Sequence, residues 1–421
     1  MLGEYLEEVS HPYILHAREQ WNVGQGGFHS AYFYSPRPLR DVSFRYVYDC
    51  GTLSKRLVLD QALKRFVASM GPHKEIDAVF LSHIDADHVN GLPSLLGSLG
   101  VRAHRIFLPL LSPVERLLAA ARAGRALNQF MVSMASDPVA ALRSISDAAI
   151  IQVSRRDDST DSDDGPEPSE SAYDIGRSPA LSILGSPDDW RESPDGQVEM
   201  TDSAMIQLDA NPGRVVPPWL LSFYICQSEL DRTSKFRSAL ARKLGVPDGE
   251  VIKADPDLIR HWLTDSASLT CVRAAYRYAG VNINASSLVM ISGPAAALVG
   301  ESVHLGKAAY QGSPATWLLT GDADLSSASA VADLVRHFGS RADRVGVVAL
   351  PHHGSIDNFH STLMHVGKHE PAVVYAAAGN SHRQWNHPHA SVIKSVTSEG
   401  SLPWVVTESP LTQISAEVVF P

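Results

Sequence analysis

The chain has 421 residues, of which 44% are hydrophobic and 19% are charged, a composition typical of a globular protein. Its 36 basic and 46 acidic residues give a formal net charge of −10, which argues against holding nucleic acid by bulk phosphate attraction. Three cysteines without a CxxC pair argue against a disulfide framework and a cysteine zinc knuckle. With no signal-peptide pattern and no long apolar stretch, we expect a cytoplasmic protein without membrane insertion.

The first part of the chain alternates strand and helix patterns, which is typical of an α/β layered fold. Apolar periodicity predicts strands at 44–48, 76–82 and 105–108, with helices at 55–69 and 92–99. The strand at 76–82 is continuously apolar, which indicates that it is buried on both faces.

The middle of the chain has a different composition. Helices are predicted at 113–146, 230–244 and 256–280, with one strand candidate at 218–226. Residues 155–171 carry a run of Asp and Glu among Ser, Pro and Gly, which predicts an acidic flexible loop.

Strand patterns return in the last third of the chain, at 287–291, 316–320, 345–350, 372–376 and 405–420. Insertions between secondary elements cost little free energy. We therefore predict one domain made of two halves, 1–111 and 281–421, and a largely helical block inserted at 112–280.

The strongest chemical signal directly follows the buried strand at 76–82. His83, Asp85, Asp87 and His88 fall within six residues there. The ends of strands converge on a cleft, and alternate residues of a turn aim at a common point. Metal binding is therefore the favoured interpretation over a polar loop that caps a helix.

Two later strand patterns end in residues of the same kind. The strand at 316–320 leads into Gly321-Asp322, and the strand at 345–350 leads into His352-His353. An ordinary turn would explain the first of these, and a solvated loop the second. Together with the first cluster they favour one site built from three strand ends.

With these pieces the chain resembles the metallo-β-lactamase-fold hydrolases, and more narrowly the soluble hydrolase domain of ComEC-type DNA-uptake proteins. The resemblance covers about residues 14–110 and 280–421 and leaves the middle block unmatched. It rests on motifs in the family's order, namely Val23-Gly24-Gln25-Gly26-Gly27, Asp49-Cys50-Gly51, Ser82 to Gly91, Ser286-Ser287-Leu288-Val289, Leu319-Thr320-Gly321-Asp322, Pro351-His352-His353-Gly354-Ser355 and Asn386-His387-Pro388-His389.

The resemblance implies an αββα sandwich with a partly helical insertion and two divalent ions, Zn²⁺ or Mn²⁺, at the sheet edges. The resemblance implies that His83 and Asp85 hold the first ion and that Asp87 and His88 hold the second. It implies that Asp322 bridges both ions. One of His352 and His353, preferably His352, would complete the ligands of the second ion.

The resemblance also implies residues around the ions. Asp49 would orient a ligating histidine, and Gln25 would lie in a loop over the site. His387 would approach the substrate or the leaving group, so that Asp87 and His387 are the candidate catalytic residues.

The chain departs from the family pattern at two points. Asp85 stands where the broad superfamily more often has a histidine, which makes the site richer in oxygen and shifts its preference toward Mn²⁺. A separate histidine for the first ion is not evident, and the weak candidates are His104, His261 and His304. ComEC-type proteins also have membrane segments, which this sequence lacks.

Other residues are better explained without a functional role. His365 and His369 are best explained as residues of a surface helix. A solvated helix face explains Arg116, Arg122 and Arg125 better than contact with phosphate does. Packing in the core explains Cys50, Trp219, Phe223 and Tyr224.

We therefore predict a hydrolase that cleaves phosphodiesters of nucleic acid or nucleotides through a metal-activated hydroxide. One alternative is hydrolysis of a carboxylic ester, thioester or lactone on the same fold. Another is a metal-bound docking module with weak activity, which binds a protein partner or a second copy through the block 112–280.

Overall fold

The computed structural model describes residues 14–34, 42–156, 172–174, 181–192, 197–208, 219–227, 230–280, 286–295, 302–305, 308–311, 315–380 and 386–420. The acidic loop predicted at 155–171 lies outside the described residues except for its first two positions.

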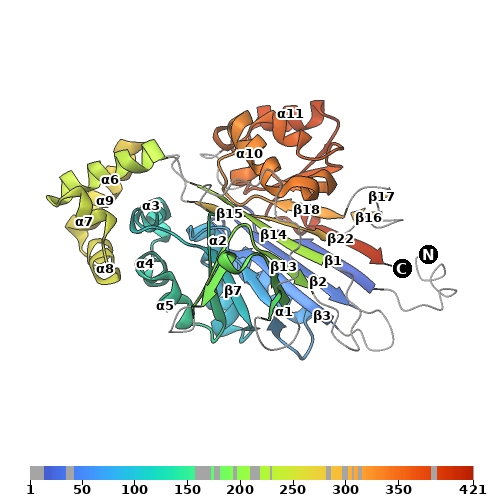
Figure 1. The fold of residues 1–421 in the computed structure, drawn as a ribbon, viewed down its shortest axis with the longest axis horizontal. Coiled ribbons are helices and arrows are strands. Elements are labelled where there is room, and N and C mark those ends of the chain that lie inside the picture. Colours follow the sequence, from blue (N-terminus) through green and yellow to red (C-terminus); the bar gives the residue numbers. More distant parts are fainter. Residues whose placement is uncertain are drawn as a thin grey trace.

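Among the described residues, two large mixed sheets form the centre of the molecule (Figure 1). The first sheet has eleven strands in the order β11-β12-β8-β7-β5-β3-β2-β1-β22-β16-β17. Their bounds are β1 Ile14–Gln20, β2 Phe28–Tyr34, β3 Val42–Cys50, β5 Ala78–Phe80, β7 Arg105–Pro109, β8 Ala149–Ser154, β11 Trp190–Glu192, β12 Val198–Thr201, β16 Ser302–Leu305, β17 Ala308–Gln311 and β22 Ile414–Phe420.

The second sheet has nine described strands in the order β21-β20-β19-β18-β15-β14-β13-β10-β9. Their bounds are β9 Ala172–Asp174, β10 Leu181–Leu184, β13 Met205–Leu208, β14 Trp219–Cys226, β15 Ser287–Pro294, β18 Thr316–Leu319, β19 Val345–Ala349, β20 Val373–Ala377 and β21 Leu402–Val406. A separate parallel pair joins β4 (Glu75–Ile76) to β6 (Arg102–Ala103).

The two sheets pack face to face over a core of large side chains from both, including Phe80 of the first sheet and Trp219 and Trp317 of the second. Helices cover the outer faces. The first sheet is covered by α1 (Arg56–Ser69), and the second by α10 (Ala328–Phe338) and α11 (Ala390–Ser398). The αββα sandwich expected from the sequence is confirmed, and β22 returns from the second half to complete the first sheet.

The block 112–280 begins and ends with helices but is not helical throughout. Strands β8 and β12 pair in the first sheet, and β13 and β14 pair in the second. The sequence pattern did not predict β8, β12 and β13. The boundaries of an inserted domain stay a prediction.

Strands β1 and β2 were also not predicted from the sequence. In β1, the side chains that face the core between the sheets include His16, Arg18 and Gln20, and all three are buried. Polar residues on the buried face remove the alternation of apolar and polar residues by which a half-buried strand is recognised.

Helices α3, α4 and α6–α9 of the block form a module with a core of its own, whereas α5 packs in the cluster on the outer face of the first sheet. Helices α6–α9 project from one end of the sandwich (Figure 1, yellow). Helix α3 belongs to this core and also lies beside the sheet edges, so it links the module to the sandwich. The bounds are α3 Pro113–Ala123, α4 Gln129–Ser136, α5 Pro138–Arg143, α6 Leu230–Leu244, α7 Asp248–Ile252, α8 Pro256–Thr264 and α9 Ser266–Ala279.

In the part of the chain that the structure describes, every helix is too short or too polar to cross a lipid bilayer.

Candidate metal centre

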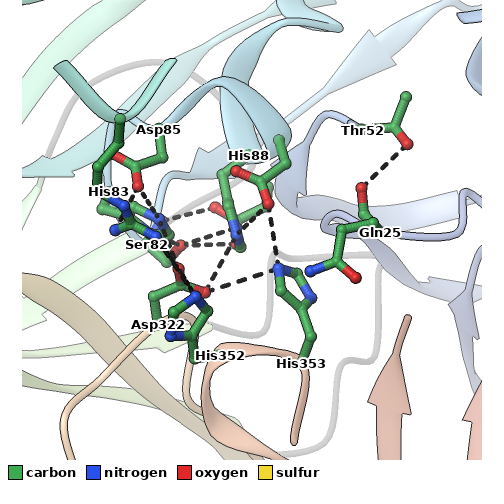
Figure 2. A network of polar contacts seen from close by, with 12 residues as sticks. Gln25, Thr52, Ser82, His83, Asp85, His88, Asp322, His352 and His353 are labelled. Carbon is green, nitrogen blue, oxygen red and sulfur yellow. Dashed lines mark hydrogen bonds and ion pairs between the residues drawn. The ribbon is translucent and has the colours of Figure 1, made fainter. Parts of the chain in front are cut away.

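Three strand ends bring the predicted ligands together. After β5, the chain enters a loop and the short helix α2 (Ala86–Val89), which carry the first His/Asp cluster. Asp322 follows β18, and His352 and His353 follow β19 in the turn Pro351–Gly354. Since β5 belongs to one sheet and β18 and β19 to the other, the cluster forms where the two sheets meet (Figure 2).

The most complete cation site is bounded by Asp87, His88, His353 and one oxygen of Asp322, and we call it the second position. Nε2 of His353 lies 3.1 Å from Asp87 Oδ2 and 3.9 Å from Asp322 Oδ1. Nε2 of His88 lies 3.9 Å from Asp87 Oδ2 and 3.4 Å from Asp322 Oδ1. A tetrahedral ion with bonds of 2.0–2.2 Å separates its ligands by about 3.3–3.6 Å, and the four measured separations of 3.1–3.9 Å lie around that value.

A neighbouring site, the first position, is bounded by His83, Asp85 and the other oxygen of Asp322. Nε2 of His83 lies 3.6 Å from Asp85 Oδ2 and 3.5 Å from Asp322 Oδ2. The two oxygens of Asp322 thus face different positions, as the bridging role implied by the resemblance requires.

The paired histidines divide differently from the expectation. The sequence favoured His352 for the second position, but the ring beside Asp87 is that of His353. Nε2 of His352 lies instead 3.6 Å from Asp322 Oδ2, on the side of the first position. His352 and His353 have left-handed backbone angles, with φ of 47° and 59°, and both of their rings lie in the site.

Asp49 and Ser82 fix the tautomers of the buried histidines. Asp49 Oδ2 accepts a hydrogen bond of 2.7 Å from Nδ1 of His88, and Asp49 also accepts bonds of 2.7 Å from the backbone N–H and hydroxyl of Ser82. Nδ1 of His83 in turn donates to Ser82 Oγ over 2.8 Å. In its neutral form each ring therefore carries its proton on Nδ1 and presents Nε2, the tautomer that binds a metal.

The donor atoms of the cluster fit a divalent cation. Nε2 of His83 and Nε2 of His88 are buried and have no hydrogen-bond partner among the described residues, and ligand atoms of these two histidines and Asp322 lie within 4.8 Å of one another. Buried polar atoms normally have a partner, so their convergence without one indicates a missing ligand. The residues present thus match the metal that the resemblance implies.

Electrostatics support the same conclusion. Burial lowers the pKa of His83, but the carboxylates of Asp322 and Asp85 outweigh this effect and raise its pKa to about 9. The pKa of His88 is also raised, because Asp49, Asp87 and Asp322 outweigh its burial. In the absence of metal the cluster attracts protons, which a divalent cation would displace on binding.

Glycines allow the backbone to approach the cluster closely. A Cβ at Gly51 would lie 2.5 Å from the backbone carbon of Asp87, and a Cβ at Gly27 would lie 3.0 Å from Nδ1 of His88. The backbone N–H of Gly27 also donates to the carbonyl of Asp87 over 3.0 Å. These contacts place the loops 24–27 and 49–52 directly behind the ligands.

Gln25 and His387 lie together at the edge of the cluster. Nε2 of Gln25 is 3.3 Å from Nδ1 of His387, and the ring of His387 lies 5.3 Å from that of His352, centre to centre. Burial, together with His353 and His352, lowers the pKa of His387 to about 3, so its ring is neutral. Gln25 also lines a small cavity with Asp85, Asp87 and His352.

Arg122 is the residue of the site that the sequence analysis misjudged. It lies in the last turn of α3, and its side chain is 15% exposed rather than on a solvated face. Its Nη1 lies 2.5 Å from Asp85 Oδ2, and its Nη2 lies 3.2 Å from Asp322 Oδ2. One available signal was its spacing of two helical turns from Glu115, which is also buried.

The weaker histidine candidates do not join the described cluster. His104 pairs with Glu75 over 3.5 Å, His261 is exposed on α8, and His304 stands opposite Glu417 in the register of β16 and β22. Most residues assigned to structural roles are where the sequence placed them: His365 and His369 are exposed, Arg125 is exposed, and Cys50, Trp219, Phe223 and Tyr224 are buried. Besides Arg122, the exception is Arg116, which is half-buried and donates to the carbonyl of Ser136 instead of lying on a solvated face.

An αββα sandwich with a His/Asp cluster at its strand ends is the arrangement that the motif resemblance implies. No family model matches the chain. No curated protein matches it either.

Solved structures that are similar to the chain include human tRNase Z and yeast PDE1. Human tRNase Z, short form (ELAC1), is 8% identical with a TM-score of 0.34, over 93% of this chain and 91% of that one. Unliganded yeast PDE1 is 9% identical with a TM-score of 0.32, over 95% of this chain and 90% of that one. These likenesses are too remote to indicate an activity.

Proposed function

We propose that the chain is a metal-dependent hydrolase of the metallo-β-lactamase type that cleaves phosphodiester bonds in nucleic acid or nucleotides. The observation that carries the proposal is the second position, where donor atoms of Asp87, His88, His353 and Asp322 lie 3.1–3.9 Å apart and His88 Nε2 is buried without a hydrogen-bond partner. Such a set is costly to bury unless a cation joins it.

A bound divalent ion would supply a Lewis acid and lower the pKa of a bound water toward neutrality. Both Zn²⁺ and Mn²⁺ suit a mixed set of nitrogen and oxygen donors. Within this proposal, the motif resemblance implies two ions, with His83 and Asp85 at the first position. Asp49 keeps His88 in the ligating tautomer.

The chain's own residues supply the remaining chemistry. Asp87 is placed to hold the ion and to accept a proton from the attacking water. The Gln25 amide oxygen accepts from the backbone N–H of Gly379 over 3.5 Å, so the amide nitrogen donates to Nδ1 of His387. His387 then carries its proton on Nε2, from which this neutral ring can donate a hydrogen bond to the leaving-group oxygen, while the proton that the leaving group takes up comes from water.

The substrate class rests on the ComEC-like motif set and on the cationic Arg122 beside the cavity. The net charge of −10 disfavours long duplexes held by bulk attraction and leaves short single strands, nucleic-acid ends and cyclic nucleotides. A cytoplasmic location, and binding of a protein partner or second copy through the block 112–280, belong to the same proposal.

The test is turnover of single- and double-stranded DNA and RNA and of cyclic dinucleotides by the purified protein with Mn²⁺ or Zn²⁺. Asp87→Asn serves as the control for contaminating nucleases. Cleavage that the variant loses supports a phosphodiesterase. Hydrolysis of ester, thioester or lactone analogues alone would move the function to the first alternative, and a bound metal with no turnover of either class would favour the docking module.

A further inference from the structure

The first position already contains a positively charged side chain. The guanidinium of Arg122 contacts Asp85 Oδ2 at 2.5 Å and Asp322 Oδ2 at 3.2 Å, the same two oxygens that face Nε2 of His83. An ion held by His83 and these oxygens would share both of them with the guanidinium.

The surrounding groups favour the guanidinium as a built part of the site. Nδ1 of His352 donates to Asn358 Oδ1 over 2.7 Å, which leaves a lone pair on Nε2. This Nε2 lies 3.4 Å from Nη2 of Arg122. Nη2 of the guanidinium therefore has two hydrogen-bond acceptors, Asp322 Oδ2 and His352 Nε2, and Nη1 forms an ion pair with Asp85 Oδ2.

The helix that carries Arg122 is fixed at both ends. At its start, Ser112 and Glu115 form a reciprocal cap, and Glu115 Oε1 also accepts from the backbone N–H and hydroxyl of Ser286 at 3.1 and 2.5 Å. Just past its end, Arg273 of α9 donates to the carbonyl of Gly124 over 2.9 Å. The sandwich and the helical module together hold Arg122 in the site.

A metal ion and this guanidinium compete for the first position. An ion bound to Asp85 Oδ2 at about 2.1 Å could lie no more than about 4.6 Å from Nη1 of Arg122, given their 2.5 Å contact. Two like charges at that separation in a buried site repel strongly. Of the residues that bound the second position, Arg122 has a described contact only with the shared Asp322, and that contact is to Oδ2, the oxygen on the side of the first position.

We propose that Arg122 is the resident cation of the first position and that the chain binds a single divalent ion, at the second position. The inference rests on the metal centre of the proposed function and revises the number of ions in it. Asp85 then serves as the anchor of Arg122, which gives a reason for a carboxylate where a histidine is the more frequent residue. The guanidinium also stays charged at all working pH values and can stabilise negative charge that develops on the substrate.

The experiment is the metal content of the folded protein after loading with excess Zn²⁺ or Mn²⁺ and removal of free ions, measured by elemental analysis. We expect one equivalent in the wild type, one in His83→Ala, and less than about one tenth in His353→Ala. Arg122→Ala should gain a second equivalent, and adding His83→Ala to it should remove that second one. Arg125→Ala, an exposed arginine three residues away, is the matched control and should keep one.

Two equivalents in the wild type, with one lost in His83→Ala, would overturn the inference and leave a metal-dependent hydrolase in place. One equivalent lost in His83→Ala but kept in His353→Ala would also overturn it. If Arg122→Ala does not fold, the wild type and the two histidine variants still decide. Failure of the proposed function looks different, since the single equivalent would be present without turnover of any substrate.

Discussion

The two cation positions of the site share the carboxylate of Asp322 but are built from different parts of the chain. The second position is made of groups from the strand-end motifs, with His88 held in its ligating tautomer by Asp49. The first position has motif residues on one side and Arg122, from the inserted block, on the other. The comparison shows that a motif pattern specifies the ligands of a site without specifying which cation fills it.

The largest effect is expected from Asp87→Asn, which removes a ligand charge at the second position. Metal affinity and turnover should both fall by at least about 10²-fold, because loss of a ligand exceeds the effect of losing a residue behind one. The free energy of unfolding of the metal-free protein should change little. Calorimetric metal titration with denaturant unfolding measures both, and retained tight binding would show that the two positions are assigned in the wrong order.

A smaller effect is expected from Asp49→Asn. Asparagine tolerates the left-handed backbone of this residue, whose φ is 58°, so the substitution changes the charge behind His88 and not the loop. Metal affinity at the second position should fall by about 10- to 100-fold. Chelator competition measures the change, and an unaltered affinity would exclude Asp49 from positioning the ligand.

Gly51→Ala tests the close packing behind the second position. The added Cβ would lie within 2.7 Å of three backbone atoms of Asp87 and His88. The free energy of unfolding should therefore be lower than that of the wild type by about 3 kcal/mol. Gly97→Ala is the control, since its Cβ meets nothing within 4 Å and it should stabilise the helix by up to about 1 kcal/mol. Equal stability of the two variants in urea unfolding would contradict the packing described here.

Asp77 provides a pH dependence of stability that is independent of the site. Burial raises its pKa to about 6, although the Arg45 backbone N–H and nearby cations lower it. The folded protein then keeps a proton that the unfolded chain releases near pH 4, so this group's contribution to stability decreases as the pH rises from about 4 to 6. Asp77→Asn should be more stable than wild type by about 3 kcal/mol at pH 7 and equal to it near pH 4. A difference of the same size at both pH values would contradict this assignment.

The smallest effect is expected from His365→Ala. The side chain is 53% exposed and pairs with Glu399 over 3.4 Å, on a short helix away from both positions. Metal content and turnover should equal those of the wild type, and stability should change by less than about 0.5 kcal/mol. A loss of metal in this variant would mean that the site is elsewhere.

The sequence predicted the parts of the fold and site that local patterns encode. Continuous apolar runs indicated β15, β18 and β19, and the density of His and Asp after β5 indicated the cluster. Strand ends in different sheets met as expected because the polar residues directly follow those runs. Local patterns also separated the surface residues His365 and His369 from the cluster.

The parts that were missed depend on distant contacts. Arg122 lies in a helical pattern that looks solvated, and its partners Asp85 and Asp322 are remote in sequence. The division between His352 and His353 depends on a left-handed turn whose backbone angles no residue type reveals. In β1, the buried face carries His16 and Arg18, so a polarity pattern indicates the wrong face.

The most direct test of the claim that a metal ion fills only the second position is a crystal structure of the metal-loaded wild-type protein. Anomalous diffraction at the absorption edge of Mn or Zn would locate the bound ions. The account predicts one anomalous peak, bounded by Asp87, His88, His353 and Asp322, with the Arg122 guanidinium still on Asp85. Two peaks about 3.5–4 Å apart, with Arg122 displaced from Asp85, would contradict it.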